Sequence, residues 1–293
     1  MKFGIIGNIG KPGLSDAVTV LLTNLERSAL EYVVDEKIAS LLAKEGRRLP
    51  ASRIGSEEEC VSRVDVVAAF GGDGTILAAA RKVGARSVPI LGVSLGKLGF
   101  LAELGPEGLH QQIVDIINKR YVIEERLVLE ATSPSIPGKT LHAVNDIVVD
   151  KSRSSRVIDL EAHIDNAFAV TFRADGLIVS TPTGSTAYAL SNGGPIVTPT
   201  SSVIGITPIS PHTLSGRPLI VPDTSIIRIV AQAESEEVLV SADGQEESVS
   251  KPPVEVVIRR ADYRLRLVKR VDRTYFDVLR AKLLWGKDPR SEM

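Results

Sequence analysis

Three glycines surround a single carboxylate in the segment "GGDGT", residues 71–75, which directly follows the apolar run "DVVAAF". Glycine lets the backbone approach a ligand closely, and the N-terminus of a following helix offers free N–H groups to phosphate oxygens. The segment matches neither the Walker loop nor the G-x-G-x-x-G dinucleotide motif. It still predicts an anion-binding corner, whose backbone comes from Gly71, Gly72, Gly74 and Thr75.

The carboxylate in this corner, Asp73, needs its own explanation. A negative charge in the loop would repel phosphate unless it had a separate role. Orienting and deprotonating a hydroxyl that attacks a phosphoryl group is such a role, and a positioned general base contributes about 10² to 10⁴-fold. The other interpretation is that Asp73 or Thr75 only caps the next helix. The local sequence leaves both interpretations open.

A second polar island interrupts "HAVNDIVVD", where Asn145 and Asp146 stand inside what otherwise has the pattern of a strand. Asn and Asp are depleted in strands, so the pair indicates a bulge, a turn or a ligand site. An amide beside a carboxylate can bind the vicinal hydroxyls of a ribose, as the acidic residue of a dinucleotide site does. A bulge and a ribose site both fit the local sequence.

The segment "FRADGLIVSTPTGSTAYALSNGGPIV", residues 172–197, follows an apolar strand and is crowded with hydroxyl groups. Hydroxyls can hydrogen-bond sugar, amide and phosphate groups without adding charge, which predicts one wall of a polar pocket. The alternative is a long surface loop with capping hydroxyls. The polar members of the segment are Asp175, Thr181, Thr183, Ser185, Thr186, Tyr188, Ser191 and Asn192.

The elements that must position these residues change in character along the chain. Over residues 1–120, short apolar runs such as "FGIIG" and "VPILGV" alternate with helical patterns. This alternation predicts crossover connections and an open, mainly parallel α/β sheet. Ligands of such sheets bind at the carboxyl ends of the strands, where "GGDGT" lies. The expected helix caps are Ser15 or Asp16, Asp35, and Ser56 with Glu59.

Residues 121–271 carry alternating patterns that predict a second, mostly β domain. Within it, Asp243-Gly244 of "SADGQ" is a strong hairpin signal. A terminal helix is expected within residues 272–293, opened by Thr274 with Asp277 and stopped by Gly286. We expect this helix to pack back on the first domain.

Composition narrows the class of protein. The 35 Lys and Arg residues balance 36 Asp and Glu residues, which gives no reason to expect a nucleic acid or an anionic membrane as partner. One cysteine and four scattered histidines predict neither a disulfide nor a protein-held metal. No stretch approaches the roughly 18 to 20 apolar residues of a membrane span, and no signal peptide is evident. A cytoplasmic protein is expected.

Taken together, the motifs closely resemble the NAD kinase family. "GGDGT" alone is shared with diacylglycerol, sphingosine and phosphofructokinases, whereas "DGLIVSTPTGSTAY" is specific to NAD kinases. The resemblance covers nearly the whole chain, because the family's order is kept by "GGDGT", "PILGVSLGKLGFLAEL", "VNDIVV", "RADGLIVSTPTGSTAYALSNGGPIV" and "TPISPHTLSGRPLIVP". It implies an N-terminal α/β domain and a C-terminal β domain that binds NAD.

Carried over position by position, the resemblance makes Asp73 the proton acceptor and Gly74 its binding neighbour. Asn145 and Asp146 resemble the pair that holds NAD hydroxyls, with Asp where Glu is commoner in the family. Lys97 of "GKLGF" stands where the family often has Arg or Asn. The further family contact positions are Arg156, Arg173, Asp175, Thr186, Ala187, Tyr188, Ala189, Leu190, Ser191 and Gln245.

The implied reaction is transfer of the ATP γ-phosphoryl group to the 2′-hydroxyl of the adenosine ribose of NAD, giving NADP. Mg²⁺ or another divalent cation would arrive with ATP, and the resemblance suggests a homo-oligomer, a dimer or a tetramer. Two other functions stay open from the residues alone. A lipid or sugar kinase could share "GGDGT", although the hydroxyl-rich wall argues against an acyl-chain pocket, and a non-catalytic sensor could bind the dinucleotide without phosphorylating it.

Overall fold

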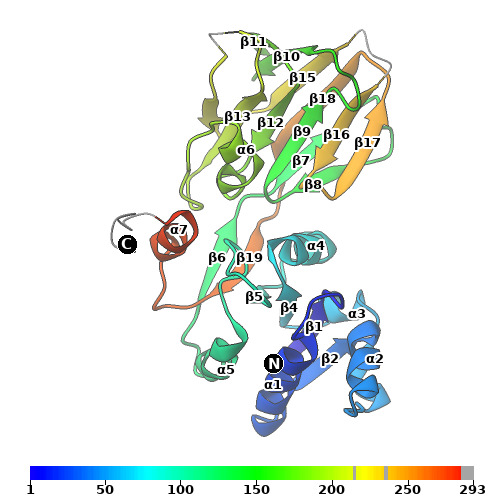
Figure 1. The fold of residues 1–293 in the computed structure, drawn as a ribbon, viewed down its shortest axis with the longest axis vertical. Helices are drawn as coiled ribbons and strands as arrows, with labels where there is room; N and C mark the ends of the chain where they lie inside the picture. The colour runs from blue at the N-terminus through cyan, green and yellow to red at the C-terminus, as the bar shows by residue number, and fades with distance from the viewer. Residues whose placement is uncertain (214–215, 234–236, 285–293) are drawn as a thin grey trace, which may run out of the picture. The chain divides into compact units, whose positions relative to one another are not determined.

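The computed structural model describes residues 1–213, 216–233 and 237–284, and the chain divides into two compact units (Figure 1). The first unit consists of Met1–Glu125 together with Arg266–Met293, and the second of Arg126–Leu265. The N-terminal α/β and C-terminal β architecture predicted from the sequence is confirmed.

A seven-stranded sheet in the order β3-β2-β1-β4-β5-β19-β6 forms the centre of the first unit. Its neighbouring strands pair in parallel from β3 through to β19, as the alternating pattern predicts. Two of its strands, β6 and β19, come from segments whose pattern groups them with the β half. The strands are β1 (Lys2–Gly7), β2 (Glu31–Asp35), β3 (Ile54–Gly55), β4 (Val66–Gly71), β5 (Ile90–Ser94), β6 (Val122–Arg126) and β19 (Leu265–Lys269).

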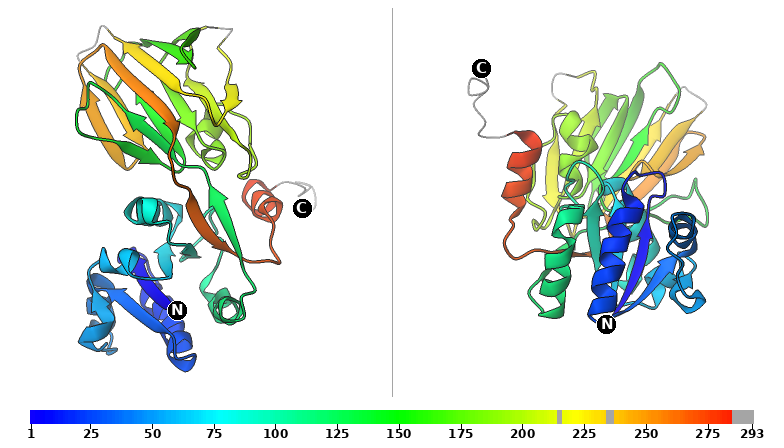
Figure 2. Two further views of the ribbon diagram at one scale, coloured as in Figure 1. Left: turned by 180° about the vertical axis from the view of Figure 1, so that it is seen from behind. Right: turned by 60° about the horizontal axis from the view of Figure 1, so that its bottom comes forward.

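Helices cover both faces of this sheet. The helices of the unit are α1 (Leu14–Arg27), α2 (Glu36–Lys44), α3 (Glu59–Ser62), α4 (Asp73–Val83), α5 (Leu109–Ile117) and α7 (Tyr275–Leu283). Helices α1, α2 and α5 share one apolar core with Phe3 and Ile5 of β1, and Figure 2 shows α1 beside α5. Gly4 points to the other face, where a Cβ would lie 1.7 Å from the carbonyl oxygen of Cys60 in α3.

Most of the predicted helix caps are present. The Asp35 carboxylate accepts the N–H of Lys37 at 2.9 Å, and Ser56 exchanges hydrogen bonds with Glu59. Thr274 and Asp277 form the predicted capping box of α7. The expectation for α1 is wrong, because its N-cap is Gly13 in the left-handed region, with φ 76° and no side-chain cap. Gly286, the expected end of the last helix, lies outside the described residues.

The strand order places a topological switch between β1 and β4. From β1 the chain moves outward to β2 and β3, and it then returns to add β4 and β5 on the other side of β1. The loops that follow β1 and β4 therefore lead away from each other, and this divergence opens a crevice at the carboxyl ends of these two strands. The loop after β4 is "GGDGT", so the predicted corner lies where open α/β sheets bind ligands.

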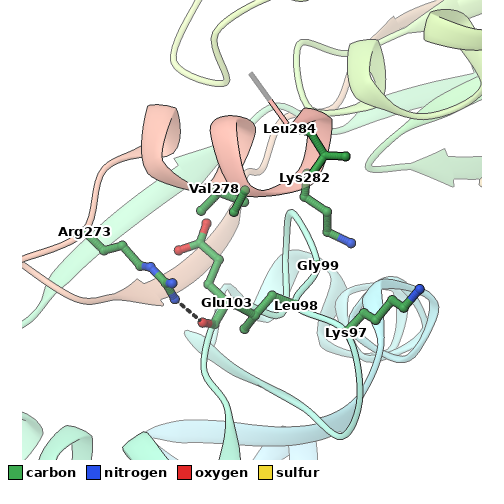
Figure 3. Close-up of a pocket in the computed structure, with 9 residues that line it drawn as sticks. Lys97, Leu98, Gly99, Glu103, Arg273, Val278, Lys282 and Leu284 are labelled. Atoms are coloured by element: carbon green, nitrogen blue, oxygen red, sulfur yellow. Dashed lines mark hydrogen bonds between the residues drawn. The ribbon is translucent and has the colours of Figure 1, made fainter. Parts of the chain in front are cut away.

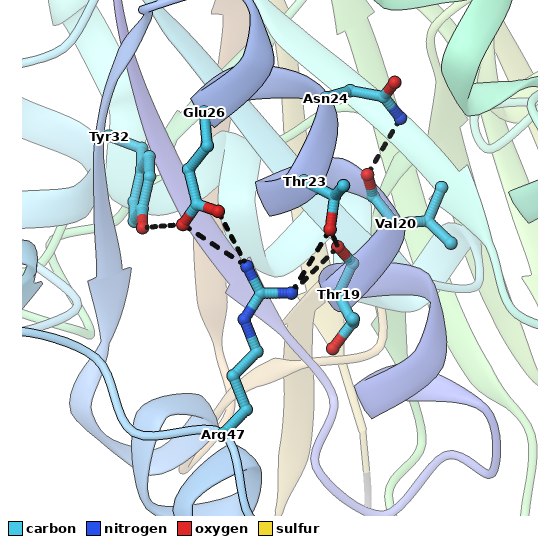
Figure 4. A network of polar contacts seen from close by, with 7 residues as sticks. All are labelled: Thr19, Val20, Thr23, Asn24, Glu26, Tyr32 and Arg47. Carbon is cyan, nitrogen blue, oxygen red and sulfur yellow. Dashed lines mark hydrogen bonds and ion pairs between the residues drawn. The ribbon is translucent and has the colours of Figure 1, made fainter.

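A polar network fixes the outer part of this sheet to α1. Arg47 donates to the carbonyl oxygen of Thr19 at 3.1 Å and pairs with Glu26 at 3.1 Å (Figure 4). Tyr32 of β2 donates its hydroxyl to Glu26 at 2.6 Å, and burial together with this contact raises the pKa of Tyr32 to about 12. The network ties β2, α1 and the segment after α2 together.

The second unit is a sandwich of two six-stranded sheets, ordered β11-β10-β15-β18-β7-β8 and β14-β13-β12-β9-β16-β17. Aliphatic side chains from both sheets share one core, as expected for strands of alternating pattern. The strands are β7 (Leu129–Thr132), β8 (Leu141–Ala143), β9 (Asp146–Asp150), β10 (Ile158–Ile164), β11 (Ala167–Ala174), β12 (Gly176–Ser180), β13 (Val203–Ile209), β14 (Leu219–Pro222), β15 (Ile227–Gln232), β16 (Val238–Ala242), β17 (Glu246–Ser250) and β18 (Val254–Arg260), with one short helix, α6 (Tyr188–Ser191).

Candidate active site

The Asp73 carboxylate is held by the main chain of a distant loop. Its Oδ2 accepts the N–H of Phe100 at 2.9 Å, and its Oδ1 accepts the N–H groups of Leu101 and Ala102, each at 3.0 Å. Three N–H donors in a row leave the side chain little freedom to rotate. The carboxylate is therefore fixed relative to the loop that follows β5.

The capping role left open for Asp73 and Thr75 is not what the structure contains. Asp73 is the first residue of α4, and the N-cap is Gly72, with no side-chain cap hydrogen bond. The Asp73 side chain is engaged with residues 100–102 instead. Thr75 is the reason that residue 71 is a glycine, because a Cβ at Gly71 would lie 2.1 Å from the Thr75 Oγ1.

Gly99 is a member of this site that the sequence motifs did not reveal. A Cβ at Gly99 would lie 1.8 Å from Oδ1 of Asp73, so any larger residue would push the carboxylate away. Gly96 in the same loop has nothing within 4 Å of the corresponding position. The requirement for glycine is thus specific to the position that faces Asp73.

A pocket of about 440 Å³ opens at the switch between β1 and β4. Backbone from the glycine-rich loop and the start of α4 forms one side, contributed by Gly72, Gly74 and Thr75. Asn8 and Lys11, from the loop after β1, line the other side. A lysine opposite a helix N-terminus is a suitable environment for an anion such as phosphate. The sequence motifs did not point to Asn8 or Lys11, because their loop has no phosphate-binding signature of its own.

The loop that holds Asp73 is braced by β19 and by the segment that leads into α7. Arg273 donates to the main-chain oxygen of Glu103 at 2.8 Å (Figure 3). Lys269 of β19 pairs with the Glu103 carboxylate. The rings of Phe100 and Tyr275 lie 6.5 Å apart. A pocket of about 410 Å³ separates the loop from the helix, and its lining includes Lys97, Leu98, Gly99, Glu103, Val278 and Lys282. Lys97 is exposed here, away from the pocket at the switch point.

In the second unit, Asn145 and Asp146 lie where β9 begins. β9 pairs with β12 in unbroken register from Asp146 to Asp150, so the bulge considered from the sequence is wrong. The carbonyl oxygen of Asn145 accepts the N–H of Thr181 at 2.8 Å, and a Cβ at Gly184 would lie 2.0 Å from that oxygen. The hydroxyl-rich segment thus packs directly against the main chain of Asn145.

Asp243 completes this cluster. Its carboxylate accepts the N–H of Val144 at 3.0 Å, of Asn145 at 2.7 Å and of Asp146 at 3.2 Å. The predicted hairpin between β16 and β17 is confirmed, with φ values of 53° at Asp243 and 60° at Gly244. Gln245 lies exposed at the same tip.

The Asp146 side chain is buried without a protein partner. Only 5% of the residue is exposed, and within the part of the chain that the structure describes its carboxyl group makes no hydrogen bond or ion pair. Burial, and secondarily the charge of Asp243, raise the pKa of Asp146 to about 7. A buried carboxylate is unfavourable until donors satisfy it, so this group is prepared to accept hydrogen bonds from a ligand.

The hydroxyl groups of residues 181–186 mostly shape their own loop. Thr181 donates to the carbonyl oxygen of Val144 at 2.5 Å, Ser185 to that of Pro182 at 2.7 Å, and Thr186 to that of Thr183 at 3.1 Å. The predicted wall of hydroxyls is therefore largely a folded scaffold. The Thr183 hydroxyl accepts a hydrogen bond from buried Arg126 at 3.2 Å.

Comparisons with known proteins give a family match in each of the two units. Residues 3–121 match the family described as the ATP-NAD kinase N-terminal domain, and residues 144–270 match the ATP-NAD kinase C-terminal domain. This chain belongs to the NAD kinase family. An NAD kinase of Bacteroides fragilis is 40% identical over 291 residues, covering 99% of this chain and 100% of that protein. An NAD kinase of Syntrophotalea carbinolica is 42% identical over 293 residues, covering 96% and 99%.

Solved structures of NAD kinase relatives share the fold. The yeast NADH kinase complexed with NADH superposes with a TM-score of 0.87 at 29% identity, covering 98% of this chain and 89% of that one. An NAD kinase from Archaeoglobus fulgidus in complex with ATP gives a TM-score of 0.76 at 24% identity, covering 98% and 100%. The predicted family, fold class and kinase activity are confirmed.

The predicted NAD kinase contact residues fall into two groups within the second unit. Arg156 and Arg173 share a pocket of about 450 Å³ with His212, and Asp175 pairs with Lys151 at 2.6 Å. These residues lie at the opposite end of β12 from Thr181. Six residue steps at about 3.3 Å each separate the two ends by about 20 Å.

The residues from Thr186 to Ser191 differ in burial, so they do not form one continuous ligand surface. Ala189 is buried against Val148 and Ile178, so its side chain belongs to the core rather than to a ligand surface. Tyr188 and Ser191 are exposed on α6, while Ala187 and Leu190 are half-buried. Asn192 donates to the Tyr188 carbonyl oxygen at 3.0 Å and closes the helix.

Two further findings bear on metals and membranes. Among residues 1–213, 216–233 and 237–284, no three His, Cys, Asp or Glu side chains are grouped so that they could hold a metal ion. No helix of the described chain is both long and apolar enough to cross a membrane.

Proposed function

We propose that this NAD kinase family member transfers the γ-phosphoryl group of ATP to the 2′-hydroxyl of the adenosine ribose of NAD, with Asp73 as the general base. The geometry of Asp73 carries this assignment. Each carboxylate oxygen can accept about two hydrogen bonds, and the described contacts use both positions of Oδ1 but only one of Oδ2. One acceptor position is left, on a carboxylate that cannot turn away.

The donor is taken to be ATP carrying Mg²⁺ or another divalent cation. We assign its phosphates to the pocket at the switch point, where Gly72, Gly74 and Thr75 present backbone and Lys11 a positive charge. Mg²⁺ usually keeps several waters and uses substrate phosphates as ligands, so it enters as part of the substrate. The cation neutralises charge on the phosphates, while the chain orients them.

The acceptor is assigned to Asn145 and Asp146. Vicinal ribose hydroxyls would give the buried Asp146 carboxylate the donors that the protein does not provide, and the Asn145 amide can donate to a ribose oxygen. The packed loop at Thr181 and Gly184 keeps both residues in place. Exposed Gln245 and Tyr188 border the same end of the sheet and are further contact candidates.

Arg156, Arg173 and Asp175 require a different arrangement, because they lie at one end of β12 and Asn145 lies beside the other end, about 20 Å away along the strand. We assign the pocket of Arg156 and Arg173 to NAD held mainly by a neighbouring copy of the chain, in a homodimer or homotetramer. Two arginines suit the pyrophosphate of a dinucleotide. No nucleic acid or membrane partner is part of the proposal, and we place the enzyme in the cytoplasm, consistent with the single free cysteine, Cys60.

The activity is tested by incubating the purified chain with NAD, ATP and MgCl₂ and detecting NADP with an NADP-specific dehydrogenase. We expect NADP and ADP in equal amounts. Product formation would exclude the non-catalytic sensor. Absence of product with ATP, other nucleotides and polyphosphate would refute the proposal, while phosphorylation of a sugar or a lipid in place of NAD would favour the alternative kinases.

A further inference from the structure

The turn between β16 and β17 contains a carboxylate, Asp243, that reaches beyond the hairpin to the start of β9. Asp243 and Gly244 have φ values of 53° and 60°, and such positions favour Gly and Asn as well as Asp. The turn closes through the N–H of Gln245, which donates to the carbonyl oxygen of Ala242 at 3.0 Å. This closing bond is made by the main chain, and the contacts of the Asp243 side chain with β9 are additional to it.

That side chain gathers three consecutive N–H groups at the start of β9. The distances from the Asp243 carboxylate to the nitrogens of Val144, Asn145 and Asp146 are 3.0, 2.7 and 3.2 Å. The Asp243 N–H in turn donates to the carbonyl oxygen of Asp146 at 2.9 Å. Hydrogen bonds to an ionised acceptor are roughly twice as strong as neutral ones, so the main chain is clamped from both sides.

The clamp has an electrostatic disadvantage that a neutral residue would avoid. The Asp243 charge faces the buried Asp146 carboxyl, and it also contributes to raising the pKa of Tyr263, to which burial and Glu130 contribute as well. An Asn at 243 would suit the turn without opposing Asp146. The presence of a carboxylate at position 243 is therefore better explained by its hydrogen bonds to three N–H groups than by the conformation of the turn.

We propose that Asp243 is a positioning residue for the acceptor: it fixes the main chain of residues 144–146 so that the Asn145 and Asp146 side chains meet the ribose hydroxyls of NAD. This inference rests on the proposed function of that pair. Asp243 itself touches no reacting atom in this account, and its effect on the reaction passes through the backbone.

The test is Asp243→Asn, which keeps a residue suited to φ 53° and replaces one acceptor oxygen with an NH₂ group. One of the three N–H groups then faces a donor. We expect KM for NAD to rise at least about 10-fold, because bonds to a charged acceptor are lost, with kcat changed by less than about threefold. KM for ATP should stay unchanged.

The matched control is Asp165→Asn in the turn between β10 and β11. Asp165 also has a positive φ, 51°, and its carboxylate accepts the N–H of Ile226 at 2.9 Å and the hydroxyl of Ser225 at 3.0 Å. It clamps a different loop, so KM for NAD should stay at the wild-type value. If Asp243→Asn does not fold, Asp243→Gly provides the same test, because glycine accepts the left-handed turn.

A pH profile separates positioning from a general loss of structure. Among the described residues, Asp243 is the charged group that acts on Asp146. In the wild type, KM for NAD should rise as the pH falls through about 7 and Asp146 takes up a proton. Asp243→Asn should move that rise to lower pH.

Asn145→Ala distinguishes failure of this inference from failure of the proposed acceptor site. If Asn145→Ala raises KM for NAD and Asp243→Asn leaves both KM and the pH profile unchanged, the positioning role is wrong and the acceptor site stands. If neither variant affects KM for NAD, the proposed acceptor site is itself wrong. A raised KM and a shifted profile in Asp243→Asn support the inference.

Discussion

The two units each contain a carboxyl group assigned to the reaction, but the surroundings of the two groups are opposite. In the first unit, Asp73 accepts three main-chain hydrogen bonds from residues 100–102. In the second unit, Asp146 is 5% exposed, has no hydrogen-bond partner among the described residues and faces the like charge of Asp243. One carboxylate is satisfied by the protein and the other is not.

This difference corresponds to two tasks. A proton acceptor must be in the correct orientation before the substrate arrives, since catalysis depends on preorganised geometry. A binding group gains most when the ligand supplies the contacts that it lacks, because an unsatisfied buried carboxylate is unfavourable. The protein therefore fixes Asp73 and leaves Asp146 to be completed by NAD.

The largest effect is expected for Asp73→Asn, which removes the basic oxygen and keeps the shape. We expect kcat to fall at least about 10²-fold, within the range of a lost general base. The dissociation constant of NAD, measured by calorimetry, should change by less than about threefold. Asp16→Asn, in the first turn of α1, is the matched control and should keep wild-type kcat. Near-normal turnover in Asp73→Asn would remove Asp73 from the catalytic role.

A somewhat smaller effect is expected for Gly99→Ala, because the carboxylate is displaced rather than removed. The added Cβ would lie 1.8 Å from Oδ1 of Asp73, whereas Gly96→Ala meets nothing within 4 Å. We expect kcat to fall about 10- to 100-fold in Gly99→Ala, since small misplacements of catalytic groups cost about that much. Gly96→Ala should have wild-type kinetics. Equal behaviour of the two variants would show that the orientation of Asp73 does not depend on Gly99.

Asp146→Asn should weaken the binding of NAD and, near pH 7, increase the free energy of unfolding. The amide lacks the charge that accepts ribose hydroxyls, so KM for NAD should rise about 10-fold. Burial raises the pKa of Asp146 to about 7, so the folded protein holds a proton that the unfolded chain has lost above about pH 4. Ionising Asp146 therefore destabilises the wild type as the pH rises toward 7.

Urea unfolding at two pH values measures this effect on stability. The free energy of unfolding of Asp146→Asn minus that of the wild type should grow by about 3 kcal/mol between pH 5 and pH 8. Glu125→Gln, at the edge of the first unit, provides the control for removal of one charge. A difference that does not depend on pH would mean that the pKa of Asp146 is not raised in the folded protein.

The smallest effect is expected for Lys11→Ala in the pocket at the switch point. Loss of one positive charge facing the donor phosphates should raise KM for ATP about fivefold and leave KM for NAD unchanged. Lys37→Ala, on the exposed side of α2, is the control. A change confined to KM for NAD would place the donor phosphates elsewhere.

Much of the fold could be predicted from patterns along the chain. Alternating strands and helices indicated the parallel sheet, and Asp35, Ser56 and Thr274 indicated helix starts, because these signals act over a few residues. Gly13 at the start of α1 was missed, since the neighbouring Ser15 and Asp16 have better capping chemistry. The strands β13 and β14 were also missed, because Pro and Ser near them are typical of loops.

The site was only partly predictable because its geometry is long-range. Asp73 and Asp146 stand out locally as carboxylates in unusual settings. Gly99 and Asp243 do not, since their roles arise from contacts with residues 26 and 97 to 99 positions away. The hydroxyl groups of Thr181 and Ser185 suggested ligand contacts, but they donate to the carbonyl oxygens of Val144 and Pro182. The sequence alone does not distinguish a hydroxyl that binds a ligand from one that bonds to the main chain.

The most direct test is a double-mutant cycle of Asp73→Asn and Gly99→Ala, followed through kcat at saturating NAD and ATP. If Gly99 affects the reaction only by leaving room for the Asp73 carboxylate, adding Gly99→Ala to Asp73→Asn should not lower kcat further. The kcat of the double variant should then equal that of Asp73→Asn within about twofold. If the fold-decreases in kcat of the two single variants multiply in the double variant, the loop and the carboxylate contribute to the reaction independently. That result would contradict the role assigned to Gly99.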